Sequence, residues 1–364
     1  MNILQIISGR SVNGALVYCK ILCEELVARG HNVTLLGRPN CWVHSNVDPT
    51  KVNLVESSLA KFPLAEFKRI GKLIRDQKID LIHTHMTRSQ NFGVGLKMMT
   101  GVPVIATAHN THFQLHWNFN DFVIANSNST YDFHAKINRV PANRMQTVYC
   151  CTDMERFCEP NPTDVVLVRS KLNLQPEDFL IAVVGELAIR KGQINLVKAL
   201  PDIVRQVPNA KVVFVGRFGR KQPHVRQIRK FILENNLAGR VKWVGRQSNV
   251  AAYLAASQLT VVPSLEEPLG LVAIESLMSG TPVVASDTGG LREIIKHGET
   301  GLLVTVGDSP RLADAVITMA RNPALRNTLA DNGQCHVLET FSNGALIDQV
   351  EAVYNRVVTK TKAA

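Results

Sequence analysis

The sequence lacks a long apolar segment. No uninterrupted hydrophobic run reaches the roughly 18 residues that a membrane-spanning helix needs. The most apolar stretch, residues 269–285, carries Glu275 and is interrupted by a glycine and a proline. Residues 1–7 are apolar, but they are too few and have no basic segment before them, unlike a secretory leader. We therefore expect a cytoplasmic protein.

Cysteine is also scarce. The seven cysteines are odd in number and scattered without the spacing of a zinc site. We expect reduced thiols, because a disulfide framework is typical of oxidising compartments. Several histidines fall near predicted strand ends, but no cysteine or carboxylate completes a zinc ligand set around them. The residues therefore disfavour a zinc site, and we expect no cofactor.

Neither common glycine-rich phosphate motif is present, because the chain has no G-x-G-x-x-G fingerprint at a strand–helix junction and no G-x-x-x-x-G-K-[ST] loop. The segment that joins the first predicted strand to the first helix does carry Gly9 and Gly14. Glycines there let the backbone approach a phosphate closely. An ordinary tight turn explains them equally well, so both interpretations stay open.

The composition is that of a soluble globular protein, with 45% hydrophobic and 20% charged residues. A length of 364 residues predicts about two domains. The net charge of +11 fits anionic ligands, nucleic acid or an acidic membrane surface without choosing among them. No nucleic-acid-binding module accompanies the charge, so we expect no nucleic-acid partner.

Strand and helix patterns alternate along the chain in two successive halves. Short Val- and Ile-rich runs that alternate with helices predict an α/β fold with parallel sheets covered on both faces. A cluster of Cys, Asp, Asn and Pro at residues 148–162 interrupts the pattern and predicts a linker between domains 1–155 and 156–340. We predict strands at residues 2–7, 33–36, 81–83, 102–107, 122–125, 180–184, 211–215, 241–243, 258–262, 282–285 and 301–304, and continuous helix from 309 to 358.

The most informative segment runs from Pro263 to Glu275. Two carboxylates, Glu267 and Glu275, stand on either side of a Pro-Leu-Gly turn that leads into an apolar helix. The free backbone N–H groups and the dipole of a helix N-terminus favour a phosphate or diphosphate. Carboxylates are poor phosphate ligands but good acceptors for sugar hydroxyls. The segment therefore predicts a site for a sugar attached to a phosphate.

Cations and histidines at other strand ends extend this prediction. Arg190 and Lys191 precede a helix, where they oppose its dipole, and they are suited to clamp a diphosphate. A solvated pair is the alternative. His109 ends a predicted strand and is our candidate for an active-site hydrogen-bonding residue. His83 is expected to be a packed strand residue, and His85 is a candidate for the acceptor side.

Aromatic and basic segments have two interpretations each. Trp117, like its neighbours Phe113 and Phe119, either stacks on a sugar of the acceptor or caps the core. Residues 61–78 form a basic amphipathic helix, which is usually a solvated surface and less often docks on an anionic membrane. Its basic residues are Lys61, Lys68, Arg69, Lys72, Arg75 and Lys78, and they alternate with Phe62, Leu64, Phe67, Ile70 and Ile74. A second basic run, residues 217–229, is expected to form a mobile loop near an anionic ligand.

Taken together, these motifs resemble the retaining glycosyltransferases of family 4, and the resemblance covers nearly the whole chain. Its strongest part is residues 267–275, continuing through 279–290 to 298–304. Residues 29–33, 80–85, 148–157 and 185–192 also match. The resemblance implies the GT-B fold, in which two Rossmann-like domains face a central crevice and a C-terminal helix, here 341–358, packs back on the first domain.

The resemblance also implies roles for these residues in transfer from a nucleotide-diphosphate sugar to a glycan or lipid-linked acceptor. Glu275 would bind the ribose, Glu267 the transferred sugar, and His109 would lie beside the reacting carbon. The loop at Gly14 would close over the donor. Lys191 and Arg190 would hold the diphosphate together with the backbone N–H groups of Leu269, Gly270, Leu271 and Val272. Such enzymes usually need no metal, and many serve cell-envelope polysaccharide or lipopolysaccharide synthesis.

One position departs from the family pattern. The family often has arginine after the glycine of the donor loop, where this chain has Glu186. Arg190 is our candidate for the missing positive charge. Glu186 also motivates a second hypothesis, a non-catalytic sugar-nucleotide-binding protein. A sugar-nucleotide epimerase on the same fold is a third hypothesis, and a phosphorylase is disfavoured because the chain is short for one.

Overall fold

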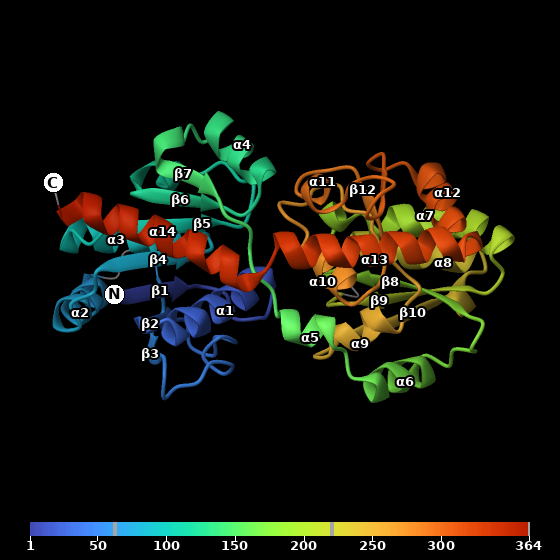
Figure 1. Cartoon of the computed structure of the whole chain (residues 1–364), viewed down its shortest axis with the longest axis horizontal. Coiled ribbons are helices and arrows are strands. Elements are labelled where there is room, and N and C mark those ends of the chain that lie inside the picture. Colours follow the sequence, from blue (N-terminus) through green and yellow to red (C-terminus); the bar gives the residue numbers. More distant parts are fainter. Residues whose placement is uncertain (61–63, 219–221, 363–364) are drawn as a thin grey trace. The chain divides into compact units, whose positions relative to one another are not determined.

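The computed structural model describes residues 1–60, 64–218 and 222–362, which form two compact units (Figure 1). The first unit comprises residues 1–153 and 341–364, and the second comprises residues 154–340. Lys61 and Phe62 of the predicted basic helix, and Arg220 and Lys221 of the second basic run, lie outside the described residues.

The first unit is built on a parallel sheet. Its described strands are β1 (Asn2–Ile7), β2 (Asn32–Gly37), β3 (Asn53–Glu56), β4 (Leu81–His85), β5 (Val104–Ala108), β6 (Phe122–Ala125) and β7 (Met145–Thr147). They lie in the order β3-β2-β1-β4-β5-β6-β7, and every pairing is parallel. The carboxyl ends of the strands therefore share one edge, where ligands of such sheets bind.

Helices cover both faces of this sheet. They are α1 (Gly14–Ala28), α2 (Leu64–Asp76), α3 (Thr87–Thr100), α4 (Asn128–Lys136) and α14 (Asn343–Lys362). Leu4, Ile6 and Ile82 form one hydrophobic cluster with residues of α2 and α3. Because side chains alternate along a strand, Gln5 and His83 lie on the opposite face. That face packs against α14, which Figure 1 shows in red along the first unit.

The C-terminal helix α14 is attached to the first unit by polar contacts as well as by packing. The Tyr354 hydroxyl is buried between Gln5 and His83. The Arg29 guanidinium pairs with the Glu351 carboxylate, which also lies 2.6 Å from the His31 ring. Burial of Tyr354 with its hydrogen bonds satisfied makes this attachment specific as well as stable.

The second unit repeats the design with a sheet ordered β10-β9-β8-β11-β12-β13, again parallel throughout. Its strands are β8 (Phe179–Val184), β9 (Ala210–Val215), β10 (Val241–Gly245), β11 (Leu259–Val262), β12 (Val283–Ser286) and β13 (Leu302–Val304). Its helices are α5 (Met154–Cys158), α6 (Pro162–Lys171), α7 (Gln193–Gln206), α8 (Pro223–Glu234), α9 (Val250–Ala255), α10 (Leu271–Met278), α11 (Leu291–Ile294), α12 (Ser309–Arg321) and α13 (Pro323–Thr340).

The predicted α/β class with parallel sheets is confirmed, and two kinds of detail differ. The short strands β3 and β7, which border the sheet of the first unit, have no counterpart in the predicted series. The predicted continuous helix after residue 309 is wrong, because α12, α13 and α14 are separate helices. Pro323 begins α13, since a proline that lacks an N–H is well suited to the first turn of a helix and ill suited to its interior.

Candidate functional site

Two loops of the second unit meet at the carboxyl edge of its sheet. Residues 185–192 follow β8 and residues 263–270 follow β11, and these strands are neighbours. The Leu265 N–H donates to the Arg190 carbonyl at 2.7 Å. Gly192, with φ of 61°, lies so near the Pro263 carbonyl that a Cβ atom would be 1.9 Å from its oxygen. Glycine is required there on both grounds, and the loops form one surface.

An ion pair joins the two loops. Lys191 Nζ lies 2.5 Å from Glu267 Oε2, and the Ser264 hydroxyl donates to the same carboxylate oxygen at 3.0 Å. The side chains of Lys191 and Glu267 are 16% and 8% exposed. A carboxylate this buried needs both partners, because an unpaired buried charge is costly. Two sequence-predicted site residues are thus brought into direct contact.

Helix α10 begins directly after this loop. Gly270 has φ of 105° and precedes Leu271, the first residue of the helix. Leu269 and Gly270 are buried, whereas Leu271 and Val272, the first residues of the helix, are half-buried. The first N–H groups of a helix have no intrahelical acceptor and favour anions. Glu275 lies within α10 and is half-buried.

Glu186, the carboxylate that departs from the family pattern, forms an ion pair with Arg217. From the sequence, Arg217 was predicted only as part of the second basic run, residues 217–229. Arg217 Nη2 donates to Glu186 Oε1 at 2.8 Å, and this hydrogen bond raises the pKa of Arg217. Arg217 follows β9, the neighbour of β8. Arg190, the residue predicted to supply the missing charge, is exposed. The partner of Glu186 is therefore Arg217. The two residues lie close together because the strands that precede them are neighbours in the sheet.

The first unit places His109 at the carboxyl end of β5. Its Nε2 lies 3.4 Å from His85 Nδ1, and its Nδ1 lies 3.8 Å from the Cys150 sulfur. The Tyr18 ring packs edge-on against it, with 5.5 Å between centroids. These surroundings lower the pKa of His109 to about 4 by burial, so the ring is neutral at pH 7.

A chain of buried hydrogen bonds continues behind His109. His85 Nε2 lies 2.9 Å from Gln5 Oε1, and Gln5 Nε2 donates to the Tyr354 hydroxyl at 3.0 Å. That hydroxyl lies 2.6 Å from His83 Nδ1, and His83 Nε2 lies 2.7 Å from Thr107 Oγ1. Burial lowers the pKa of His83 to about 3. The prediction that His83 is a packed strand residue is confirmed.

Two residues assigned to the acceptor side need correction. Trp117 is fully buried and packs in a core cluster with Ala106, Ala108 and Val123, so it does not offer a face to a sugar. Its neighbours Phe113 and Phe119 are exposed, although the sequence could not distinguish these two residues from Trp117. His85 is also fully buried and contacts Gln5 and His109. It supports His109 and cannot touch an acceptor directly.

The remaining predicted position of the first unit lies at the start of α1. Gly14 is exposed and begins the helix, where the Asn13 side chain accepts a hydrogen bond from the Leu16 N–H. A capped helix start of this kind satisfies one backbone donor by itself. The loop that precedes α1 follows β1, at the carboxyl edge that also holds His109.

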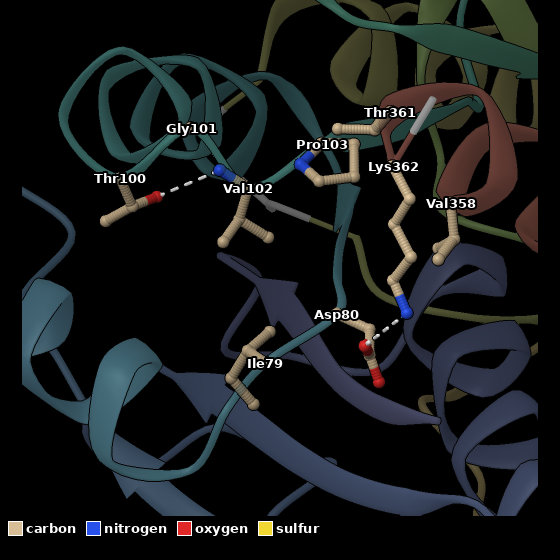
Figure 2. A pocket seen from close by; sticks show the side chains of 9 residues that line it. All are labelled: Ile79, Asp80, Thr100, Gly101, Val102, Pro103, Val358, Thr361 and Lys362. Atoms are coloured by element: carbon tan, nitrogen blue, oxygen red, sulfur yellow. Dashed lines mark hydrogen bonds and ion pairs between the residues drawn. The ribbon is translucent and has the colours of Figure 1, made fainter. Parts of the chain in front are cut away.

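The opposite edge of this sheet carries a hollow of about 260 Å³ (Figure 2). It is lined by Ile79, Asp80, Thr100, Gly101, Val102, Pro103, Val358, Thr361 and Lys362. Figure 2 shows Lys362 reaching toward Asp80, with 3.6 Å between the charged atoms. Because these residues precede β4 and β5 or end α14, the hollow is remote from His109.

Two further observations concern the described residues only. Within residues 1–60, 64–218 and 222–362, no group of three or more His, Cys, Asp or Glu side chains is arranged to hold a metal ion. In the same part of the chain, every helix is too short or too polar to cross a membrane.

Two family models match consecutive parts of the chain. Residues 12–156 match the model described as Glycosyltransferase Family 4, and residues 167–336 match the one described as Glycosyl transferases group 1. The chain is 27% identical over 375 residues to the N-acetyl-alpha-D-glucosaminyl L-malate synthase of Bacillus anthracis, which covers 97% of this chain and 96% of that protein.

A second relative and a solved structure complete the comparison. The lipopolysaccharide core biosynthesis glycosyltransferase LpsD of Rhizobium meliloti is 30% identical over 204 residues, which cover 56% of this chain and 57% of that protein. Anabaena Alr3699/HepE, solved in complex with UDP and glucose, is similar in fold with a TM-score of 0.87. Its sequence identity is 22%, and the match covers 98% of this chain and 100% of that one.

Proposed function

Because the chain belongs to the group 1 glycosyltransferases and shares their GT-B fold, we propose that it is a retaining hexosyltransferase. It moves a sugar from a nucleotide-diphosphate sugar to a hydroxyl of a glycan or lipid-linked acceptor. The observation that carries the proposal is the contact of Lys191 with Glu267 beside the start of α10.

This contact puts the required chemistry in one place. The ammonium group of Lys191 has three donors, so it can hold Glu267 and still reach a phosphate oxygen. With the first N–H groups of α10, it counters the charge that grows on the leaving diphosphate as the glycosidic bond breaks. Glu267 then accepts hydrogen bonds from hydroxyls of the transferred sugar, and Glu275 accepts them from hydroxyls of the ribose. Arg190, exposed in the same loop, adds positive charge near the diphosphate.

The donor is proposed to carry UDP. The solved relative from Anabaena was crystallised with UDP and glucose, and it matches 98% of this chain in fold. The test is release of UDP from UDP-hexoses in the absence of acceptor, which transferases of this kind catalyse slowly as hydrolysis. Wild-type protein should release UDP and Lys191→Ala should not, whereas equal rates for both would refute the proposal.

His109 is proposed to act as a neutral hydrogen-bonding group beside the reacting sugar. With a pKa of about 4, its ring is a poor proton acceptor at pH 7. The leaving phosphate is therefore proposed to take the acceptor proton, with attack from the same face and retention at the anomeric carbon. The anomeric configuration of the product, read by proton NMR, tests this, and inversion would exclude it.

No metal is required in this proposal, because Lys191, Arg190 and the helix N–H groups supply the positive charge that a divalent cation would otherwise provide. Turnover should be unchanged when EDTA is added and when Mg²⁺ or Mn²⁺ is restored. Loss of turnover in EDTA that a metal reverses would contradict this part of the proposal.

The acceptor is proposed to be an intermediate of cell-envelope synthesis, because the relative LpsD is named as a glycosyltransferase of lipopolysaccharide core biosynthesis. Peripheral contact with an anionic membrane from a cytoplasmic location is part of the proposal. Phe113, Leu115 and Phe119 are all more than half exposed after β5. On α2, Lys68 and Arg75 are exposed, whereas Arg69 and Lys72 pair with acids of the same helix. Failure to sediment with phosphatidylglycerol vesicles at low salt would refute the membrane contact.

The non-catalytic alternative rested on Glu186. Since Arg217 pairs with that carboxylate, Glu186 does not bring an uncompensated negative charge to the loop, and the ground for this alternative is weakened. An epimerase remains distinguishable by experiment, because it would change the sugar of the donor without any acceptor and without forming a new glycosidic bond.

A further inference from the structure

Three arginines of the first unit follow strands that are neighbours in the sheet. Arg10 lies in the loop after β1, Arg38 directly follows β2, and Arg88 lies in the first turn of α3 after β4. The order β2-β1-β4 is parallel, so all three arginines lie at its carboxyl edge. His109 follows β5 at the same edge.

Backbone contacts hold these segments together. The Trp42 N–H donates to the Arg10 carbonyl at 3.2 Å, which ties the loop after β1 to the segment after β2. Gly9 packs against the turn after β4, since a Cβ atom there would lie 3.0 Å from Met86 Sδ. The loop that carries Arg10, which is itself exposed, therefore contacts the segments that carry the other two arginines.

The three guanidinium groups have no counter-charge in the described residues. Within residues 1–60, 64–218 and 222–362, none of Arg10, Arg38 and Arg88 forms an ion pair or a side-chain hydrogen bond. Arg38 Nε is fully buried without a partner. Glu56 is the acidic residue at this edge opposite Gly37 in register, yet it makes no ion pair with Arg38 in the described structure. Arg38 as a whole is half-buried and Arg10 and Arg88 are exposed, so an oxyanion from solvent can reach these unpaired donors and satisfy them.

The charges also act on one another. Burial lowers the pKa of Arg38, and the positive charges of Arg10 and Arg88 lower it further. Like charges that gather without an acidic partner destabilise a fold and at the same time create a strong positive potential for an anion. Planar guanidinium forks suit oxyanions in particular, because they bind carboxylate and phosphate through two parallel hydrogen bonds.

We propose that Arg10, Arg38 and Arg88 form a binding site for an oxyanion, a phosphate or carboxylate group that the acceptor carries. The site lies wholly in the first unit, whereas the diphosphate of the donor is assigned to α10 and Lys191 of the second. The anion site itself follows from the arginines alone, and only its assignment to the acceptor rests on the proposed function.

The test is isothermal titration of the full chain with inorganic phosphate and, separately, with succinate, at constant ionic strength. Arg38→Gln and Arg88→Gln should each weaken binding of the favoured ion about tenfold or more, as expected for loss of a charge-assisted hydrogen bond. Arg139→Gln is the matched control, because Arg139 is an exposed arginine of the same unit to which no binding role is assigned, and it should bind like wild type. Arg88 is itself exposed, so its variant should keep the fold if Arg38→Gln does not.

The outcomes are separable from those of the donor site. Binding that depends on Arg38 and Arg88 and persists in Lys191→Ala supports the proposal, and the tighter ion identifies the anionic group. Glycerol 3-phosphate and phosphatidic acid vesicles then tell a soluble phosphate from a lipid-borne one. Absence of binding, or a single phosphate site lost in Lys191→Ala, overturns the proposal. A chain that keeps the arginine site but binds no nucleotide sugar would refute only the proposed function.

Discussion

The Lys191 ammonium and the Glu267 carboxylate, 76 positions apart in sequence, lie 2.5 Å from each other. The contact exists because β8 and β11 are neighbours in a parallel sheet and deliver their following loops to the same edge. It couples the cation proposed for the diphosphate to the carboxylate proposed for the sugar. A change at either residue should therefore affect both parts of the donor.

Lys191→Ala should lower turnover by a factor of about 10²–10³, the usual effect of removing one group that stabilises developing negative charge. Lys198→Ala, an exposed lysine of α7 in the same unit, is the matched control and should keep wild-type turnover. Steady-state kinetics with the donor identified by binding provide the measurement. Near-normal turnover of Lys191→Ala would remove this residue from the mechanism.

Arg217→Ala should weaken donor binding, although Arg217 need not touch the donor. The substitution frees the negative charge of Glu186 beside the loop that holds the diphosphate. Adding Glu186→Gln should restore the affinity, because it removes the repelling charge. Donor KM for the single and double variants gives the answer, and a double variant as weak as Arg217→Ala would show that Arg217 binds the donor itself.

Tyr354→Phe should destabilise the first unit by about 1–3 kcal/mol, because it leaves the buried polar atoms of Gln5 and His83 without their shared partner. Urea unfolding followed by circular dichroism measures the loss. An unchanged free energy of unfolding would mean that this hydrogen-bond chain does not hold α14 in place.

Stability should fall as the pH is lowered below about 6.5. The buried rings of His83, His116 and His134 have pKa values lowered to about 3, 4 and 4. The unfolded chain therefore binds more protons than the folded one below the ordinary histidine pKa, so their contribution is complete above that pKa and is lost below it. At pH 5 the loss is about 2 kcal/mol for His83 alone. Thermal unfolding at pH 5, 6, 7 and 8 tests this, and a flat profile would contradict it.

The alternation of Val- and Ile-rich runs with helices was sufficient to predict two parallel α/β halves, because buried parallel strands leave a clear hydrophobic signature. The strand β3 was missed because its four residues are half-buried or exposed and carry little of that signature. The sequence also does not show which side chains of one short segment face the core. Trp117 is buried and Phe113 and Phe119 are exposed, although all three belong to the same aromatic segment.

The candidate site shows the same division. Lys191, Glu267 and Glu275 stand in local motifs whose chemistry is readable from the residues themselves. Arg217 and the group formed by Arg10, Arg38 and Arg88 become significant only through the order of the strands, which brings distant loops to one edge. Sequence periodicity predicts strands, but it does not give their neighbours, so these partnerships needed the structure.

The central claim is that α10 and its preceding loop bind a nucleotide sugar. Thermal unfolding with UDP-, GDP-, ADP- and dTDP-sugars tests it most directly, with Glu275→Ala as the control variant. A ligand at a hundred times its dissociation constant should add about 2.7 kcal/mol of stability. We predict stabilisation by UDP-sugars that Glu275→Ala abolishes. No stabilisation by any of the four classes, or equal stabilisation of the variant, would contradict the account.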